Sequence, residues 1–439
     1  LWIITKQPMS LITNRHGVFM KSPITKVCLA LTISFSAALT HTYADDELIV
    51  ISEQVAPSQY PVAVMPFSEA HQMSHYLSLA GLGTTHQNLP QHTQTNSDIL
   101  NNLTAWRNRG FEYIILAQSH QILGNKLAIN YEIIDTANGL VSVKHTQISD
   151  NHPASIQAAY RQISDTIYQI ITGQPSDLMG KIAYVEESGS PQNKISSLKL
   201  IDPSGQLIRT LDTVNGSIIT PTFSPDGLSI AYSVQTKNNL PIIYIVSVSG
   251  GTPKLVTPFW GHNLAPSFSP DGGSILFSGS HENNNPNIYR LNLHTNHLDT
   301  LTTFNGAENA PNYLADASGF IYTADKGTRH QSLYRYDFGT THSTQIASYA
   351  TNPRLSPDGS KLVYLSGGQI IIANTKGRIQ QSFRVLGTDV SASFSPSGTR
   401  IIYTSNQGNK NQLMIRSLSS NAIRTIPTSG TVRDPIWSK

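Results

Sequence analysis

Three carboxylates recur in one short motif and are the first candidates for chemistry. Asp226, Asp271 and Asp358 each occur in the sequence Ser-Pro-Asp-Gly. Paired carboxylates could act as a general acid and a general base. Each aspartate, however, lies between a proline, which restricts φ, and a glycine, which accepts positive φ, so the motif predicts a tight turn. We therefore interpret the three aspartates as turn residues.

The other patterns that could support catalysis or cofactor binding are incomplete. His71 and His75 are four residues apart, which suits two zinc ligands on one helix face, but no third ligand is identifiable. Gly81-x-Gly83 lacks the third glycine and the preceding strand of a dinucleotide-binding turn, so we interpret it as a loop. The Gly-x-Ser-x-Gly turn of serine hydrolases does not occur. We therefore assign no catalytic, metal or cofactor-binding residue.

The turn motif belongs to a longer repeat, Pro-x-Phe-Ser-Pro-Asp-Gly. Its full, degraded and partial copies are Pro221–Gly227, Pro266–Gly272, Pro311–Tyr313, Pro353–Gly359, Ala392–Gly398 and Pro435–Ser438. A recurrence at roughly 40–45 residues is typical of four-stranded propeller blades. Each copy begins with a short strand, and an apolar second strand such as Ile230–Ser233 follows the turn.

The two ends of the repeat region are complementary. Pro435–Ser438 is a first strand with no second strand after it, and Ile182–Val185 is a second strand with no first strand before it. We expect the two to pair, which would leave the ring without a long open edge. The sequence thus predicts an all-β six-bladed propeller over residues 181–439, closed by its own C-terminus.

Residues 1–44 are predicted to lie outside the fold. A basic stretch precedes the uncharged apolar segment Val27–Leu39, and Ala44 ends a small-residue cleavage site. We expect a cleaved signal peptide, a mature chain that begins at Asp45, and a soluble secreted protein. Cys28 is the only cysteine, so the mature chain would have no thiol for disulfides, catalysis or zinc binding.

Residues 45–173 are predicted to form a small α/β domain. An apolar segment at Leu48–Ile51 precedes the proline-containing linker Ala56–Pro61, so we expect residues 45–55 to be mobile. The expected elements are strands at Val62–Phe67, Tyr113–Gln118, Leu127–Ile134 and Leu140–Ile148, and helices near Ser97–Arg109 and from Pro153 to a stop at Gly173. The net charge of +3 and the absence of a basic helix or groove argue against nucleic acid as a partner.

This combination of a signal segment, an α/β domain and a self-closed propeller resembles the TolB family, periplasmic components of the Tol–Pal system of Gram-negative bacteria. Closer matches are Val62–Phe67, Trp106-Arg107, Ile182–Val185 and His262-Asn263-x-Ala265-Pro266. The resemblance implies a monomeric, non-enzymatic adaptor without cofactors. It implies binding of the lipoprotein Pal at the channel mouth and of TolA by the N-terminal segment, with roles in outer-membrane integrity, cell division and colicin import.

The loops that enter the six inner strands carry mostly polar residues, which could hydrogen-bond a protruding loop of a partner. The expected Pal-binding residues are Thr220, His262, Asn263, Ala265, Glu308, Asn309, Ala310, Thr351, Asn352, Asp389, Arg433 and Asp434. The apolar N-terminal segment suits addition to the sheet edge of another protein. The expected TolA-binding residues are Asp46, Glu47, Leu48, Ile49, Val50 and Ile51.

Two alternatives remain open from the sequence. A propeller hydrolase of the lactonase type would hold a metal ion in its channel, and the polar mouth includes side chains of the types that bind hard cations. A carbohydrate-binding module would need exposed aromatic residues at the mouth, for which Phe259 and Trp260 are candidates.

Overall fold

The structure is a computed structural model. It describes residues 60–439 except 87–88, 90–94, 143–144, 191, 282–284, 305, 388–389 and 408–409. The expected signal peptide, the N-terminal segment with Asp46, Glu47 and Leu48–Ile51, and the mouth residue Asp389 therefore lie outside the described residues. Among the described residues, none of the helices is both long enough and apolar enough to span a membrane.

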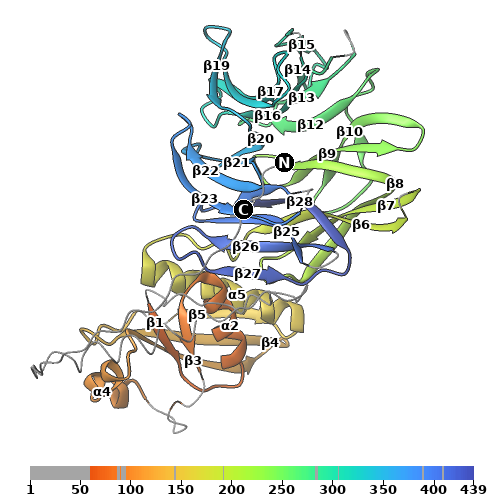
Figure 1. Ribbon diagram of the computed structural model, residues 1–439. Helices are drawn as coiled ribbons and strands as arrows, with labels where there is room; N and C mark the ends of the chain where they lie inside the picture. The colour runs from red at the N-terminus through yellow and green to blue at the C-terminus, as the bar shows by residue number, and fades with distance from the viewer. Residues whose placement is uncertain are drawn as a thin grey trace, which may run out of the picture. The chain divides into compact units, whose positions relative to one another are not determined.

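The α/β part contains one five-stranded sheet (Figure 1). Its strands are β1 (Pro61–Val64), β2 (Gly83–Thr85), β3 (Tyr113–Ile122), β4 (Lys126–Asp135) and β5 (His145–Asp150), in the order β2-β1-β3-β4-β5. Helices α2 (Ala70–Ala80) and α5 (Pro153–Thr172) bury their apolar residues in one core with this sheet. The short helices α3 (Asn96–Leu100) and α4 (Leu103–Asn108) belong to a second core, which contains the alternate side chains of β1 and β3.

The local expectations for this part are met with two differences. The single helix expected near Ser97–Arg109 is two helices, and the Thr95 side chain caps the first of them by accepting from the Asp98 N–H. For the strand expected at Leu140–Ile148, the structure describes β5 from His145, an isolated bridge between Val141 and Ile134, and a turn with Gly139 at φ 72° before them; residues 143–144 lie outside the described residues. Both differences come from local backbone turns within apolar stretches, which periodicity does not reveal.

The propeller part consists of four four-stranded sheets and one seven-stranded sheet. The four-stranded sheets are β12 (Asn263–Phe268), β13 (Ser274–Gly279), β14 (Asn287–Asn292) and β15 (Leu298–Thr300); β16 (Glu308–Tyr313), β17 (Gly319–Ala324), β18 (Ser332–Asp337) and β19 (His342–Ala347); β20 (Thr351–Leu355), β21 (Lys361–Ser366), β22 (Gln369–Asn374) and β23 (Ile379–Arg384); and β24 (Ala392–Phe394), β25 (Arg400–Gln407), β26 (Lys410–Ser417) and β27 (Ile423–Ile426).

The seven-stranded sheet contains both ends of the propeller sequence. Its strands are β6 (Lys181–Ser190), β7 (Asn193–Ile201), β8 (Leu207–Phe223), β9 (Ser229–Thr236), β10 (Asn239–Ser247), β11 (Lys254–Leu255) and β28 (Thr431–Ser438), in the order β11-β10-β9-β8-β7-β6-β28. The N-terminal half of β8 pairs with β7 and its C-terminal half pairs with β9. One continuous strand therefore serves as the outer strand of one set and the inner strand of the next.

The inner strands form a closed circuit. In the order β8, β12, β16, β20, β24 and β28, each contacts the next, and β28 contacts β8 (Figure 1). The last strand is antiparallel to β6, with Ile436 opposite Ala183 and Trp437 opposite Ile182. The predicted all-β propeller and the pairing of its two ends are thus confirmed.

The repeated Ser-Pro-Asp-Gly segments are turns, as interpreted from the sequence. Ser224 Oγ donates to Asp226 Oδ1 at 2.6 Å, the Leu228 N–H donates to the same oxygen at 2.9 Å, and Gly227 has φ 68°. These hydrogen bonds, that from the Ser224 hydroxyl foremost, lower the pKa of Asp226. The carboxylates at Asp271 and Asp358 accept from serine hydroxyls in the same way. The three aspartates therefore hold turns rather than pair with one another.

Removal of residues 434–439 should open the ring, because it deletes one of the two segments of β28 that pair with β6, Ile436–Ser438, and with it the buried Trp437. Loss of a buried tryptophan alone costs about 3–5 kcal/mol, a large part of a typical free energy of unfolding. Urea unfolding monitored by circular dichroism would measure the loss, with deletion of the exposed Lys439 alone as the control. If the truncated chain unfolds at the same urea concentration as the full-length chain, β28 does not close the ring.

Candidate functional site

The inner strands share an unusual backbone feature at the residue before the repeat proline. Five non-glycine residues there are left-handed, with φ between 47° and 54°: Thr220, Ala265, Ala310, Asn352 and Asp434. At each of them the register to the neighbouring strand shifts. Such a bulge interrupts the hydrogen-bond ladder and changes the direction in which a residue points. Left-handed φ is energetically unfavourable for residues other than glycine, so it is uncommon at such positions. Its recurrence in five inner strands indicates that the ring centre requires this conformation.

These bulge residues meet at the centre of the ring. Together with Ser391, which immediately precedes β24, and with Asn312 and Arg354, they line a cavity of about 30 Å³. A cavity of this size has room for water but not for a bulky side chain. The cavity therefore has no room for a large ligand.

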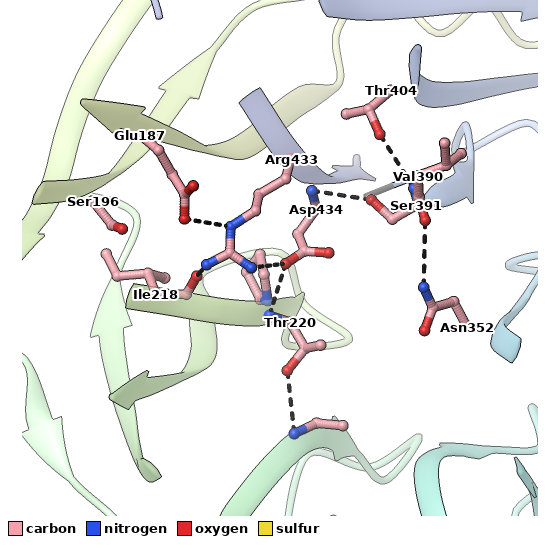
Figure 2. A network of polar contacts seen from close by, with 12 residues as sticks. Glu187, Ser196, Ile218, Thr220, Asn352, Val390, Ser391, Thr404, Arg433 and Asp434 are labelled. Carbon is pink, nitrogen blue, oxygen red and sulfur yellow. Dashed lines mark hydrogen bonds and ion pairs between the residues drawn. The ribbon is translucent and has the colours of Figure 1, made fainter. Parts of the chain in front are cut away.

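Asp434 connects three inner strands (Figure 2). Its carboxylate oxygen Oδ2 accepts from the Thr220 N–H at 3.2 Å, and its own N–H donates to Ser391 Oγ at 3.0 Å. Thr220 continues the chain, because its Oγ1 accepts from the Ala265 N–H at 3.1 Å. A side-chain oxygen of one bulge residue thus accepts from the N–H of the next.

The chain of hydrogen bonds changes where the bulge residues are alanines. Ala265 and Ala310 have no side-chain oxygen, so neither can repeat the link that Thr220 and Asp434 make. On the other side of this gap, Asn352 Nδ2 donates to the Val390 carbonyl at 3.3 Å. The centre is therefore polar on the side of β28 and less so on the side of β12 and β16.

Arg433 balances the negative charge beneath Asp434. Its Nε pairs with Glu187 Oε1 at 2.8 Å, its Nη2 donates to the Ile218 carbonyl, and its Nη1 lies 3.4 Å from Asp434 Oδ2 (Figure 2). Arg354 also faces the centre and donates to the Pro221 carbonyl at 3.3 Å. Burial lowers the pKa of Arg354, and the charge of Asp434 opposes that shift. The partly buried carboxylates of Glu187 and Asp434 thus share a cationic partner in Arg433.

Large apolar side chains surround this polar centre on the loops that lead to four successive inner strands. Trp260 is 90% exposed, Leu386 68%, Tyr349 60% and Phe304 43%. We call these four residues the mouth crown. His262 is exposed between Trp260 and the start of β12. Exposed aromatic side chains around a polar centre are typical of protein-binding surfaces.

The predicted mouth residues that the structure describes fall into four groups. His262, Thr351 and Asn352 are exposed at the mouth, while Thr220, Ala265, Ala310, Arg433 and Asp434 lie at or just below the cavity. Asn309 is partly buried and accepts from Ser278 Oγ. Asn263 and Glu308 are fully buried, so they support the mouth from beneath.

Sequence reasoning missed Asn312, Arg354, Ser391 and most of the mouth crown. The repeat itself contained a signal for Asn312, Arg354 and Ser391, because the first two directly follow the repeat's first position and the third directly precedes it. Arg354 reaches the carbonyl of Pro221 on a strand far away in sequence. Only the closed ring brings that pair together.

No group of three or more histidine, cysteine or acidic side chains is placed to hold a metal ion within the described part of the chain. His71 packs edge-on against His86, with 5.4 Å between the ring centroids, while His75 packs against Tyr76. His71 and His75 therefore each make an aromatic contact and are not part of a metal-ligand group among the described residues.

The fold and its central site define a β-propeller protein with an α/β part, a small polar central cavity and exposed apolar side chains on the loops that lead to four inner strands. A profile described as "TolB beta propeller domain" matches residues 168–439. The chain belongs to the TolB beta-propeller family.

Individual relatives are consistent with this assignment. The Tol-Pal system proteins TolB of Methylococcus capsulatus and Acinetobacter baylyi are 29% and 30% identical over 238 and 204 residues, which cover 52% and 45% of this chain and 55% and 46% of theirs. The chain thus spans about half the length of these relatives. The crystal structure of TolB from Acinetobacter baumannii is 30% identical, covers 88% of this chain and 98% of its own, and superposes with a TM-score of 0.77.

Replacement of Asp434 by alanine should destabilise the ring by about 1–3 kcal/mol, because the Thr220 N–H and Arg433 lose an acceptor. Asp434→Asn keeps a side-chain oxygen and a residue type that tolerates left-handed φ, so it should lose less. Urea unfolding of the two variants gives the comparison. Equal losses would mean that the carboxylate hydrogen bonds do not hold the centre.

Proposed function

We propose that this protein is the periplasmic adaptor of a Tol–Pal system, with a ring of six blades, two of which share β8. In this proposal the ring mouth binds Pal, the N-terminal segment binds TolA, and the protein has no catalytic activity. Membership of the TolB family, together with the mouth crown around the polar centre, carries the proposal. The function would be maintenance of the outer membrane and its constriction during cell division.

The geometry of the mouth indicates how a partner loop would bind. The central cavity is too small for a deep insertion, so only a small polar group of the partner would reach the bulge residues. The apolar parts of the same loop would pack on Trp260, Tyr349, Phe304 and Leu386. Such central polar contacts within an apolar, water-excluding rim favour specific binding.

The hydrogen-bonded ring centre has a role of its own in this proposal. The bulge residues are held by hydrogen bonds between strands, so they present fixed donors and acceptors to the partner. A preformed polar site avoids the entropic cost of ordering side chains when the partner binds.

Trp260→Ala and His262→Ala should each weaken binding of soluble Pal by about 1–3 kcal/mol, because each removes an exposed side chain beside the channel. The control is Leu228→Ala, since Leu228 is 57% exposed in the turn at the opposite end of the inner half of β8. Isothermal titration calorimetry would measure all three affinities. Unchanged affinity for both mouth variants would place the Pal site elsewhere.

Deletion of residues 45–55 should abolish TolA binding and leave Pal binding nearly intact, because the deleted segment is the apolar stretch suited to a sheet edge. Binding of each partner to the deleted and the mature protein can be compared by surface plasmon resonance. A second, length-matched variant would replace Leu48–Ile51 with four serines in the full-length mature chain, which removes the apolar side chains and keeps the chain length. TolA binding by either variant would move that site into the α/β domain.

A further inference from the structure

Glu308 is a buried acid at the start of β16, directly beneath the mouth. Its side chain is fully buried, and neither carboxylate oxygen has a hydrogen-bond partner among the described residues. Its backbone is well anchored, because the N–H donates to the Pro286 carbonyl at 2.8 Å and the carbonyl accepts from Ser278 Oγ at 2.6 Å. The backbone therefore fixes the position of a carboxyl group whose oxygens make no close hydrogen bond, although the Thr302 hydroxyl is a neighbouring donor.

Strand β12 has a residue, Asn263, at the position equivalent to that of Glu308 in β16. Two successive inter-sheet junctions have the same hydrogen bonds at one constant offset along the chain. Thr257 Oγ1 accepts from the Ile243 N–H, and Thr302 Oγ1 accepts from the Ile288 N–H, both at 2.9 Å. The offset that takes Thr257 to Thr302 also takes Asn263 to Glu308. The two side chains are thus in equivalent positions.

A second pair of contacts supports the equivalence. The His262 N–H donates to Ser280 Oγ at 3.0 Å, and the Ala307 N–H donates to Asp325 Oδ1 at 3.2 Å. The same offset relates both the donors and the acceptors of these two hydrogen bonds.

Asn263 uses its amide as a donor to three backbone carbonyls. Its Nδ2 lies 3.4 Å from the Pro241 oxygen, 3.2 Å from the Phe259 oxygen and 3.1 Å from the Gly261 oxygen. At the equivalent position of the next sheet, the corresponding carbonyls belong to Pro286, Phe304 and Gly306. An ionised carboxylate has no proton to donate to a carbonyl, whereas a protonated carboxyl has one.

The charges around Glu308 do not compensate for its burial. Burial raises the pKa of Glu308 to about 7, against the smaller opposing effects of the Thr302 hydroxyl and the Lys326 ammonium group. Lys326 lies over the rings of Phe304 and Tyr334, at 4.4 and 3.9 Å from their centroids. Of the other ionisable neighbours, Tyr322 is on β17, and Asp325 accepts from the Ala307 and Gly327 N–H groups.

We infer that Glu308 is a proton-binding site that stabilises the loop before β16 at the mouth. The protonated carboxyl donates a hydrogen bond to a backbone carbonyl of the segment with Phe304 and Gly306, and this hydrogen bond is lost when the carboxyl loses its proton. Phe304 is a mouth-crown residue and also contacts Lys326. Deprotonation would place a negative charge against backbone carbonyl oxygens, which repel it. The apolar crown would then lose its fixed geometry on the side of β16, where the bulge residue Ala310 has no side-chain oxygen to accept a hydrogen bond.

The direction of the pH dependence follows from the raised pKa. Below pH 4.5 the group is protonated in both the folded and the unfolded chain, so its contribution to folding is fully present. Between pH 4.5 and about 7 the folded state binds the proton more tightly, so stability falls as the pH rises. Above about 7 both states are ionised, and the contribution is lost.

The direct test is ¹³C NMR of the mature protein labelled at the glutamate carboxyl carbons. The resonance that is absent from Glu308→Gln belongs to Glu308, and we expect its titration midpoint near pH 7. A midpoint at or below the ordinary glutamate value of 4.5 would overturn the inference.

Thermal unfolding of Glu308→Gln provides a second test. The glutamine amide can donate to the carbonyls as Asn263 does, so the variant should match the unsubstituted protein at pH 5 and melt at a higher temperature at pH 8. The exposed Glu112→Gln is the control for loss of one negative charge and should follow the unsubstituted protein at both pH values. A Glu308→Gln variant that melts lower at pH 8 would contradict the proton-donor role.

A third test rests on the proposed function. Binding of soluble Pal should weaken several-fold between pH 6 and pH 8 for the unsubstituted protein and change less for Glu308→Gln. An equal pH dependence in the two proteins would refute control of the mouth by Glu308. Absence of Pal binding at every pH would instead refute the proposed function, and the NMR titration would still decide the proton site.

Discussion

The antiparallel pairing of β28 with β6 is the constraint on which the ring and its centre both depend. Because the chain end supplies the inner strand beside β6, the two ends of the propeller sequence are held together by backbone hydrogen bonds and by the buried Trp437. The same strand carries Arg433 and Asp434, which connect it to β6, β8 and the residue before β24. Closure of the fold and assembly of the polar centre are therefore one event.

The polar centre is stable because its groups are paired in sequence around the ring. Asp434 accepts from the next bulge residue, Thr220 accepts from the one after, and Arg433 neutralises the carboxylates near it. Removal of one partner would leave another polar group buried and unpaired, which costs more than the net value of the hydrogen bond. The apolar crown lies on loops outside this network, so it can vary without loss of the ring.

Repetition of one backbone geometry allows single side chains to change the chemistry of the mouth. Asn263 and Glu308 occupy equivalent positions with the same surrounding hydrogen bonds, yet one is a permanent donor and the other donates only when protonated. The two alanines at the neighbouring bulges leave this side of the ring with fewer side-chain links. The side of the mouth at β12 and β16 is thus the part whose order depends most on local conditions.

The propeller, its turns and its closure could be predicted from the amino-acid sequence alone. The recurrence of Pro-x-Phe-Ser-Pro-Asp-Gly predicts strands and turns at regular spacing, since proline and glycine restrict φ locally and apolar alternation is set by burial. The unmatched strands at Ile182 and Trp437 likewise predicted their own pairing. These features depend on residues that are near in sequence or on a simple count of strands.

Which polar residues face the centre, and in what protonation state, depends on the packing of the sheets in the tertiary structure. Left-handed φ at Thr220, Ala265 and Ala310 follows from the constraint of the ring, because no local preference of threonine or alanine favours it. The burial of Glu308, and the absence of a close hydrogen bond to its carboxylate oxygens among the described residues, depend on strands from two sheets, so its charge could not be inferred from neighbours along the chain. Desolvation is a property of the packed environment, and that environment exists only once the sheets have closed around it.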